Sequence, residues 1–221
     1  MSVPGIETKV AFLRRPEAYP EKPRTVEVVE THMSWVFLTE HHAFKLKKPV
    51  RYDSLDFSTL ELRKHDCEEE VRLNRRLATD VYLGTLELTF DPAAGLELAG
   101  AGEPVDWLVH MRRLPADRML DERILRGQIG ESEVRPAALH LARFYAAARP
   151  LVLAAPEYRS RLERGVRSDL DELCRPEFGL CRSQVITLAE SQLAFLAERP
   201  ALFDERIDAG RIIEGHGDLR P

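Results

Sequence analysis

The stretch "TVEVVETHMSWVFLTEHHAFKLKKPV", residues 25–50, decides the fold class. Apolar and polar residues alternate in "TVEVVE", "SWVFLT" and "HHAFKLKKPV", and only short polar breaks separate these three runs. Such alternation is typical of half-buried β-strands, and breaks this short leave room only for tight connections. We therefore expect three successive strands that form an antiparallel meander.

The segment "LDFSTLELRKHDCEEEVRLNRRLATD", residues 55–80, changes to a helical period. Ser58 or Thr59 can cap the N-terminus of this helix, because a hydroxyl oxygen accepts a hydrogen bond from a free backbone N–H there. Charged residues cover most of its surface. Four apolar residues are candidates for its buried side: Leu60, Val71, Leu73 and Leu77.

Two more strands are expected at "VYLGTLELTF", residues 81–90, and "VDWLVHMRRL", residues 105–114. The hairpin-like connection between them, residues 91–104, carries the Gly, Pro and Asp typical of turns. Beyond Pro115 the strand patterns stop. Helical patterns fill the remainder, at residues 116–127, 131–148, 157–174 and 181–198.

These patterns predict an α+β fold in three parts. Residues 1–24 form an arm with one possible short helix, residues 25–114 form a sheet with one helix, and residues 115–221 form a helical region. Two apolar stripes of the helical region are expected to be core rather than cofactor contacts. They consist of Ala137, Leu141, Phe144 and Tyr145, and of Val185, Leu188, Leu193, Phe195 and Leu196.

Composition narrows the class of protein. The 221 residues include 32 Lys and Arg against 37 Asp and Glu, a formal net charge of −5 that argues against general binding to nucleic acid. Charges and Pro4 interrupt the N-terminus, and no window approaches the roughly 20 apolar residues of a membrane span. We expect a cytoplasmic protein. Its three cysteines have no CxxC spacing, so we expect reduced, mostly buried thiols and no zinc site.

A lysine-rich strand is the first candidate for chemistry. In "AFKLKKP", residues 43–49, strand alternation puts Ala43, Lys45 and Lys47 on one face. A small residue two positions before a lysine would let a flat ring approach while the ammonium reaches its phosphates. The alternative is an edge strand whose lysines prevent aggregation.

Three consecutive acids in "CEEE", residues 67–70, cannot all face one way on a helix. One of them could turn inward and pair with the strand lysine, which would orient the ammonium towards a phosphate. The alternative is that all three are solvated.

The segment "IIEGHGDLRP", residues 212–221, resembles a strand that leads into a catalytic loop. Asp218 could accept the proton of a substrate hydroxyl and orient it for attack on a terminal phosphate. The alternative is an ordinary polar turn. The order of strand lysine, helix acid, helical region and His-Gly-Asp favours the catalytic interpretation.

With these segments the chain resembles the aminoglycoside phosphotransferase-like proteins of the protein-kinase-like fold. It is most similar to a bacterial group often fused to a C-terminal P-loop ATP-binding domain. The resemblance is carried by residues 31–84, by "WLVHMRRLPADRML" at 107–120, and by "EGHGDLRP" at 214–221. It implies a two-lobe fold, with a nucleotide-binding N-lobe at 25–114 and a helical C-lobe from 115 that is incomplete.

The resemblance also implies roles for individual residues. Lys45 would hold the nucleotide phosphates, and Glu70, with Glu69 as a close competitor, would pair with Lys45. Met111 would follow the strand that borders the adenine pocket. Asp218 would be the catalytic-loop base.

Three further expectations complete this assignment. His216 would brace the catalytic loop, and Ala43 would admit the adenine ring. The segment "ETHMSW" at 30–35 lacks a glycine-rich phosphate loop, so Ser34 and nearby amides would contact phosphate instead.

The implied cofactors are ATP and Mg²⁺, but the family's later metal ligands are absent from this sequence. We expect a chain cut just after its catalytic loop, with impaired activity.

The expected function is ATP-dependent transfer of a phosphoryl group to a small-molecule hydroxyl. The alternative is a non-catalytic nucleotide-binding module that acts with a partner or a fused ATPase domain. A third interpretation, a helical interaction protein, predicts that Lys45 and Glu70 lie far apart. The sequence identifies neither the phosphoryl acceptor nor whether ATP or GTP is the donor.

Overall fold

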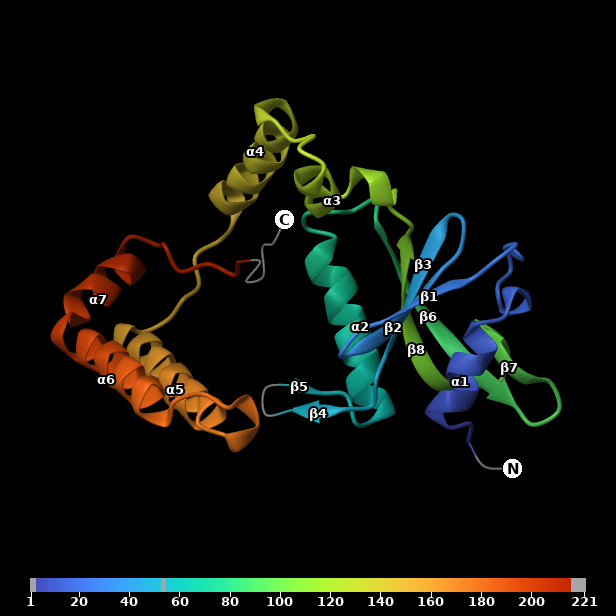
Figure 1. Cartoon of the computed structure of the whole chain (residues 1–221), viewed down its shortest axis with the longest axis horizontal. Coiled ribbons are helices and arrows are strands. Elements are labelled where there is room, and N and C mark those ends of the chain that lie inside the picture. Colours follow the sequence, from blue (N-terminus) through green and yellow to red (C-terminus); the bar gives the residue numbers. More distant parts are fainter. Residues whose placement is uncertain (1–2, 53–54, 216–221) are drawn as a thin grey trace. The chain divides into compact units, whose positions relative to one another are not determined.

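The computed structural model describes residues 3–52 and 55–215 (Figure 1). It is an α+β structure, with an antiparallel sheet and its helices in the N-terminal part and a helical region in the C-terminal part. The expected fold class is confirmed at this level. Two compact units divide the chain, one up to Leu141 and the other from Ala142 onward.

The main sheet has six antiparallel strands, one more than the sequence patterns predicted. They are β1 (Glu27–Glu30), β2 (Ser34–Leu38), β3 (His42–Lys47), β6 (Tyr82–Asp91), β7 (Gly95–Leu98) and β8 (Glu103–Arg112). Their order is β1-β2-β3-β8-β6-β7, so the lysine strand β3 lies inside the sheet. The alternative of a protected edge strand is therefore wrong. The sequence analysis also missed a two-stranded hairpin of β4 (Arg51–Tyr52) and β5 (Leu55–Asp56).

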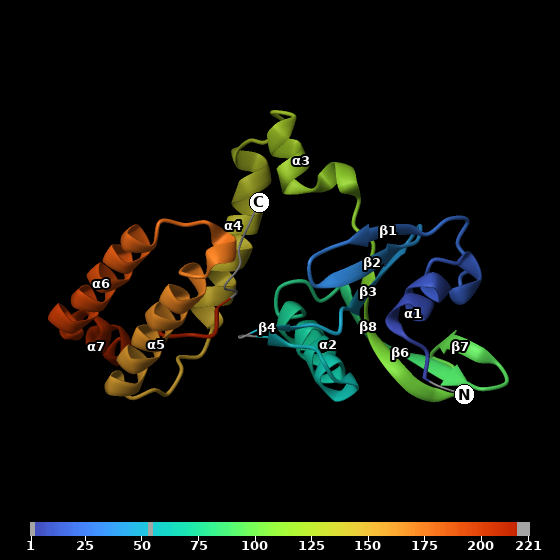
Figure 2. The same ribbon diagram turned by 60° about the horizontal axis from the view of Figure 1, so that its bottom comes forward.

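One face of the main sheet carries the apolar core. Helix α1 (Ile6–Leu13) and the 3₁₀ turn η1 (Pro16–Ala18) cover this face. Leu13 and Tyr19 pack there against Phe44 and Leu46 of β3, and all four residues are buried. Figures 1 and 2 show α1 and α2 (Leu60–Asn74) on opposite sides of the sheet.

Helix α2 covers the other face. Its N-cap is Thr59, whose hydroxyl accepts a hydrogen bond from the Leu62 N–H at 3.2 Å. Arg63, Cys67 and Val71, spaced four residues apart, are its buried positions. Leu73 was expected on the buried side but is 37% exposed. The reason is rotation, since two residues turn a helix by about 200° away from Val71.

A buried ionic cluster holds both helices to β8. Asp106 is 1% exposed and accepts hydrogen bonds from Lys9 of α1 at 2.8 Å and from Arg63 of α2 at 2.8 Å. Lys9 also donates to the Val105 carbonyl, and Arg63 donates to the Phe57 carbonyl. All charges of this cluster have partners, as buried charges require.

The helical region contains five α-helices in its described part. They are α3 (Leu120–Leu125), α4 (Glu131–Ala147), α5 (Ala155–Leu173), α6 (Arg182–Glu198) and α7 (Pro200–Asp208), with 3₁₀ turns η2 (Ala116–Arg118) and η3 (Pro176–Phe178). Helix α7 was not expected, because the last helical pattern in the sequence ended at residue 198. Pro200 begins α7, since proline is tolerated in the first turn.

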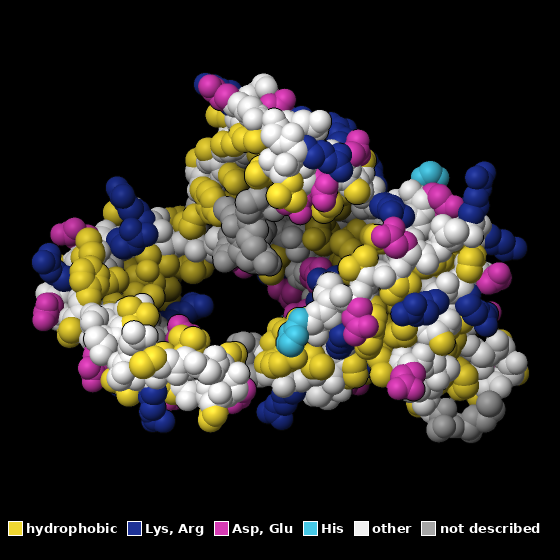
Figure 3. All heavy atoms as spheres, in the orientation of Figure 1, with side chains coloured by type: hydrophobic (Ala, Val, Ile, Leu, Met, Phe, Trp, Pro, Cys, Tyr) yellow, Lys and Arg dark blue, Asp and Glu magenta, His cyan; other side chains and the backbone are white. Residues whose placement is uncertain are grey.

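The two apolar stripes of the helical region are not the closed core that the sequence predicted. Ala189 is the only buried residue that the structure gives for α3 to α7, while Leu188 is 59% and Phe195 is 49% exposed. Figure 3 shows hydrophobic side chains open at the surface of these helices. Within the second unit α5 packs against α6 and α7.

Other sequence predictions can be compared directly. Of the three free cysteines only Cys67 is buried, whereas Cys174 is half-buried and Cys181 is exposed, so the expectation of mostly buried thiols was wrong. Within residues 3–52 and 55–215, none of the helices combines the length and the apolar character that crossing a membrane would need.

Candidate functional site

The register of the sheet brings four sequence-predicted site residues onto the α2 face. Directly opposed residues of antiparallel strands project from the same face. Lys45 pairs with Val36 of β2 and Val109 of β8, and Ala43 pairs with Met111 of β8. By the same pairing, the residues that share this face are Ser34, Ala43, Lys45 and Met111.

Lys45 and Glu70 form an ion pair between the centre of the sheet and α2. The Lys45 Nζ lies 2.9 Å from Glu70 Oε1 and 3.1 Å from Oε2. The Lys45 side chain remains 30% exposed and that of Glu70 is 14% exposed. The prediction that these two residues lie far apart, made by the interpretation as a helical interaction protein, is therefore wrong.

The competing acid, Glu69, has a different partner. It accepts hydrogen bonds from the guanidinium of Arg72 on the exposed side of α2, the shortest at 2.7 Å. Successive residues of a helix point about 100° apart, so only one of the two acids can face the sheet. Glu70 is that acid.

Lys47 is a member of this cluster that the sequence analysis placed on the correct face but gave no role. Its side chain is only 4% exposed, its Nζ lies 2.6 Å from Glu70 Oε2, and it also pairs with Asp66. The ammonium lies 5.0 Å from the centre of the Phe57 ring. Asp66 and Glu70 are one helical turn apart, a spacing that could have indicated a shared partner.

Electrostatics keep both buried members of the cluster charged. Burial alone would raise the pKa of Glu70, but the ammonium groups of Lys45 and Lys47 outweigh burial and hold that pKa below its ordinary value. Burial alone would lower the pKa of Lys47, but Glu70 and Asp66 raise it above its ordinary value. The result is a neutral set of two cations and two anions.

Ser34, Ala43 and Met111 surround this cluster on the sheet. Ser34 is 1% exposed, and its N–H and carbonyl bond to Thr31 and so close the turn between β1 and β2. Ala43 is 7% exposed beside the half-buried Met111, which packs on Cys67 and Val71 of α2. Their roles towards phosphate and adenine stay predictions.

The predicted catalytic loop cannot be placed, since His216 and Asp218 lie outside the described residues. The expected roles of Asp218 as the catalytic base and of His216 as the residue that braces its loop therefore stay predictions. Across the residues that are described, no three His, Cys, Asp or Glu side chains are grouped so as to hold a metal ion.

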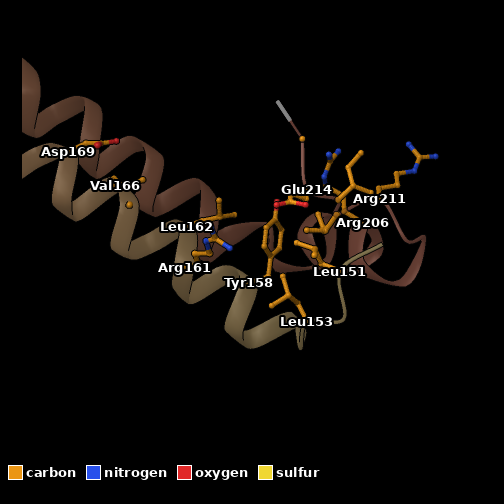
Figure 4. Close-up of a pocket in the computed structure, with 14 residues that line it drawn as sticks. Leu151, Leu153, Tyr158, Arg161, Leu162, Val166, Asp169, Arg206, Arg211 and Glu214 are labelled. Carbon is orange, nitrogen blue, oxygen red and sulfur yellow. The ribbon is translucent and has the colours of Figure 1, made fainter. Parts of the chain in front are cut away.

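A hollow of about 910 Å³ in the second unit was not predicted. Figure 4 shows Arg206, Arg211 and Glu214 at one end of it and Asp169 at the other, with Tyr158 between them. Its guanidinium groups can pair with anions, and its carboxylates can accept hydrogen bonds from hydroxyls. The lining residues span 151–215, so no single motif could have revealed it.

Comparison with known proteins gives distant relatives without a described function. The chain is 35% identical over 196 residues to the uncharacterized protein Rv2004c of Mycobacterium tuberculosis and to the uncharacterized protein Mb2027c of Mycobacterium bovis. The match covers 88% of this chain and 38% of each relative, so the chain spans well under half the length of these homologues. No family model matches the sequence. No solved structure matches it either.

Proposed function

We propose that the chain is the nucleotide-binding part of an ATP-dependent phosphotransferase, similar to the aminoglycoside phosphotransferase-like proteins and of the protein-kinase-like fold. The observation that carries this proposal is the ion pair between Lys45 and Glu70. In phosphotransferases of the kinase type, a strand lysine paired with a helix glutamate positions the nucleotide phosphates.

The local geometry supports the assignment of Lys45 rather than Lys47 to the phosphates. Both ammonium groups contact Glu70, but the Lys45 side chain is 30% exposed and that of Lys47 is 4% exposed. Only Lys45 can therefore reach a ligand without rearrangement. Ala43 lies opposite Met111, and its small side chain suits a position where an adenine ring packs on the sheet.

In the proposed reaction a substrate hydroxyl attacks the γ-phosphorus of ATP. A bond forms between that oxygen and phosphorus, the bond to the β–γ bridging oxygen breaks, and ADP leaves with the electron pair. Asp218 accepts the hydroxyl proton, and His216 braces the loop that carries it. Because the described residues offer no metal-binding cluster, we assign no step to Mg²⁺.

Calorimetric titration with ATP and Mg²⁺ tests the binding half of the proposal. Lys45→Ala should weaken ATP binding at least about tenfold, since it removes a charge-assisted contact with phosphate. Lys48→Ala is the matched control, because Lys48 comes directly after the end of the same strand but pairs with Glu30. Equal affinities of wild type and Lys45→Ala would overturn the proposal.

Turnover tests the catalytic half. We expect the chain to release phosphate slowly from γ-labelled ATP, with water in place of the unknown alcohol, and expect Asp218→Asn to abolish that release. ATP binding with no turnover would instead favour the alternative, a non-catalytic nucleotide-binding module acting with a partner or an attached P-loop ATPase domain.

A further inference from the structure

Lys47 occupies a position that a ligand-binding lysine would not. It follows Lys45 by two residues on β3 and projects from the same face, but its side chain is almost completely buried. A lysine is rarely buried to this extent without a paired acid. The role of Lys47 therefore lies in its contacts with other residues inside the protein.

Lys47 binds two acidic side chains of α2. Its ammonium pairs with Asp66 and with Glu70 Oε2 at 2.6 Å, two carboxylates one turn apart on the helix. Lys45 approaches the same Glu70 carboxylate from the exposed side. Glu70 is thus bound from two directions, and α2 is bound to β3 at two successive turns.

We infer that Lys47 is a positioning residue that fixes Glu70 and α2, so that the ammonium of Lys45 is held ready for phosphate before nucleotide binds. This inference rests on the proposed function. A single exposed ion pair is worth little and breaks easily. The buried pairing through Lys47 makes the position of Glu70 independent of Lys45, and so removes the helix movement that would otherwise precede binding.

The simpler alternative is that Lys47 only contributes to folding. It predicts that a Lys47 variant unfolds at a lower temperature but binds ATP normally wherever it is folded. The two alternatives therefore differ in what the folded variant does. All measurements below are made well under each variant's unfolding midpoint.

The first measurement does not depend on nucleotide. Cys67 lies on the same face of α2 and is fully buried, so its reaction with a thiol reagent such as DTNB reports release of the helix. In a Cys174→Ser, Cys181→Ser background, we expect Lys47→Met to speed this reaction about tenfold. Lys45→Ala and the control Lys48→Met should leave the rate unchanged. Equal rates in Lys47→Met and wild type would overturn the inference.

The second measurement is ATP affinity by calorimetry. Lys47→Met should weaken binding about tenfold, and Asp66→Asn, which leaves the contact between Lys47 and Glu70, should weaken it less. Lys47→Arg keeps the charge and should restore most of the affinity. If Lys47→Met does not fold, Asp66→Asn and Lys47→Arg still decide the matter, because unchanged affinity in Asp66→Asn would contradict the inference.

The pH profile of ATP binding separates positioning from folding. The charged or titratable groups around Glu70 include Lys45 and Lys47 of β3, Asp66 and Cys67 of α2 and Tyr82 of β6. With Lys47 replaced, Glu70 loses one of the two cations that hold its pKa down, so Glu70 becomes protonated at a higher pH. As the pH is lowered, ATP binding by the variant should therefore weaken at a higher pH than ATP binding by wild type. An unchanged profile, with Lys45→Ala still defective, would refute the inference and leave the proposed function intact. Failure of wild type itself to bind ATP would refute the proposed function.

Discussion

Arg63 on α2 donates from its Nε to Oδ1 of Asp106 on β8 across 2.8 Å, although both side chains are almost completely buried. Lys9 of α1 reaches Oδ2 of the same carboxylate. One strand residue therefore anchors helices on both sides of the sheet. The consequence is that loss of this single negative charge should affect the whole N-terminal unit.

Asp106→Asn should lower the free energy of unfolding by about 3–5 kcal/mol, because it leaves Lys9 and Arg63 buried without a counter-charge. Urea denaturation followed by circular dichroism measures this change. The control Asp80→Asn alters an exposed aspartate and should change stability by no more than about 0.5 kcal/mol. Similar values for the two variants would show that the cluster does not support the fold.

His110 should make the stability of the fold depend on pH. Its ring stacks on Phe44, and its Nε2 is buried with no hydrogen-bond partner among the described residues. Burial lowers the pKa of His110, His42 lowers it further, and Glu21 acts in the opposite sense. The unfolded chain therefore takes up this proton at a higher pH than the folded chain does.

The lowered pKa of His110 in the folded chain makes the free energy of unfolding decrease towards acidic pH. Stability should fall as the pH drops below about 6.5, the ordinary value for histidine, until the lowered folded pKa is passed. His110→Phe keeps the stacking with Phe44 and does not titrate, so its unfolding free energy should fall less between pH 7.5 and 5.5 than that of wild type. A slope equal to that of wild type would exclude His110 as the source.

Gly102 should be intolerant of any side chain. A Cβ at this position would lie 2.5 Å from the carbonyl carbon and oxygen of Phe90 on the neighbouring strand β6, closer than atoms can approach. Gly102→Ala should therefore destabilise the unit by about 2 kcal/mol or more. Gly165→Ala is the matched control, because an added Cβ would meet no atom within 4 Å apart from its sequence neighbours and its own helix backbone, and alanine favours the helix. It should raise stability by about 0.5–1 kcal/mol, as thermal unfolding would show.

The cysteines should differ widely in reactivity. Burial raises the pKa of the Cys67 thiol to about 12, whereas a hydrogen bond with Ser183 and the N–H of Gln184 lower the pKa of the exposed Cys181. Because the thiolate is the reactive form, Cys181 should react with DTNB at pH 8 at least about a hundredfold faster than Cys67. Mass spectrometry of partly labelled protein identifies the site. Early labelling of Cys67 would mean that α2 opens readily.

Strand alternation was a sound guide to the sheet. It located β2 and β3 and the face of Lys45, because successive side chains of a strand alternate between its two faces, here the α1 face and the α2 face. It missed β7, where only four residues pair, and it misplaced Leu73 on a helix whose polar buried positions hide the period.

The ionic contacts were less accessible to sequence reasoning. The residue pattern allowed only that one acid of residues 68–70 could pair with the strand lysine, and the family resemblance named Glu70, with Glu69 as a close competitor. The double attachment of Glu70 through Lys47 depends on the register of β3 against α2, and the cluster at Asp106 joins residues almost a hundred positions apart. Such contacts follow from tertiary packing and leave no local pattern. The apolar stripe of α6 was visible in the sequence, but the extent of its burial was not. A helical period indicates one apolar face and does not show what covers that face.

The placement of Lys9 and Tyr19 has a practical result for anyone who wants a smaller version of this protein. A recombinant chain that starts at β1 would look complete in a sheet diagram, but it would remove the α1 cation from Asp106 and the Tyr19 ring that lies 4.8 Å from Phe44. The bared surface of Phe44, Leu46 and Leu108 would then favour aggregation. Shortened versions for crystallisation or spectroscopy should therefore begin before Ile6.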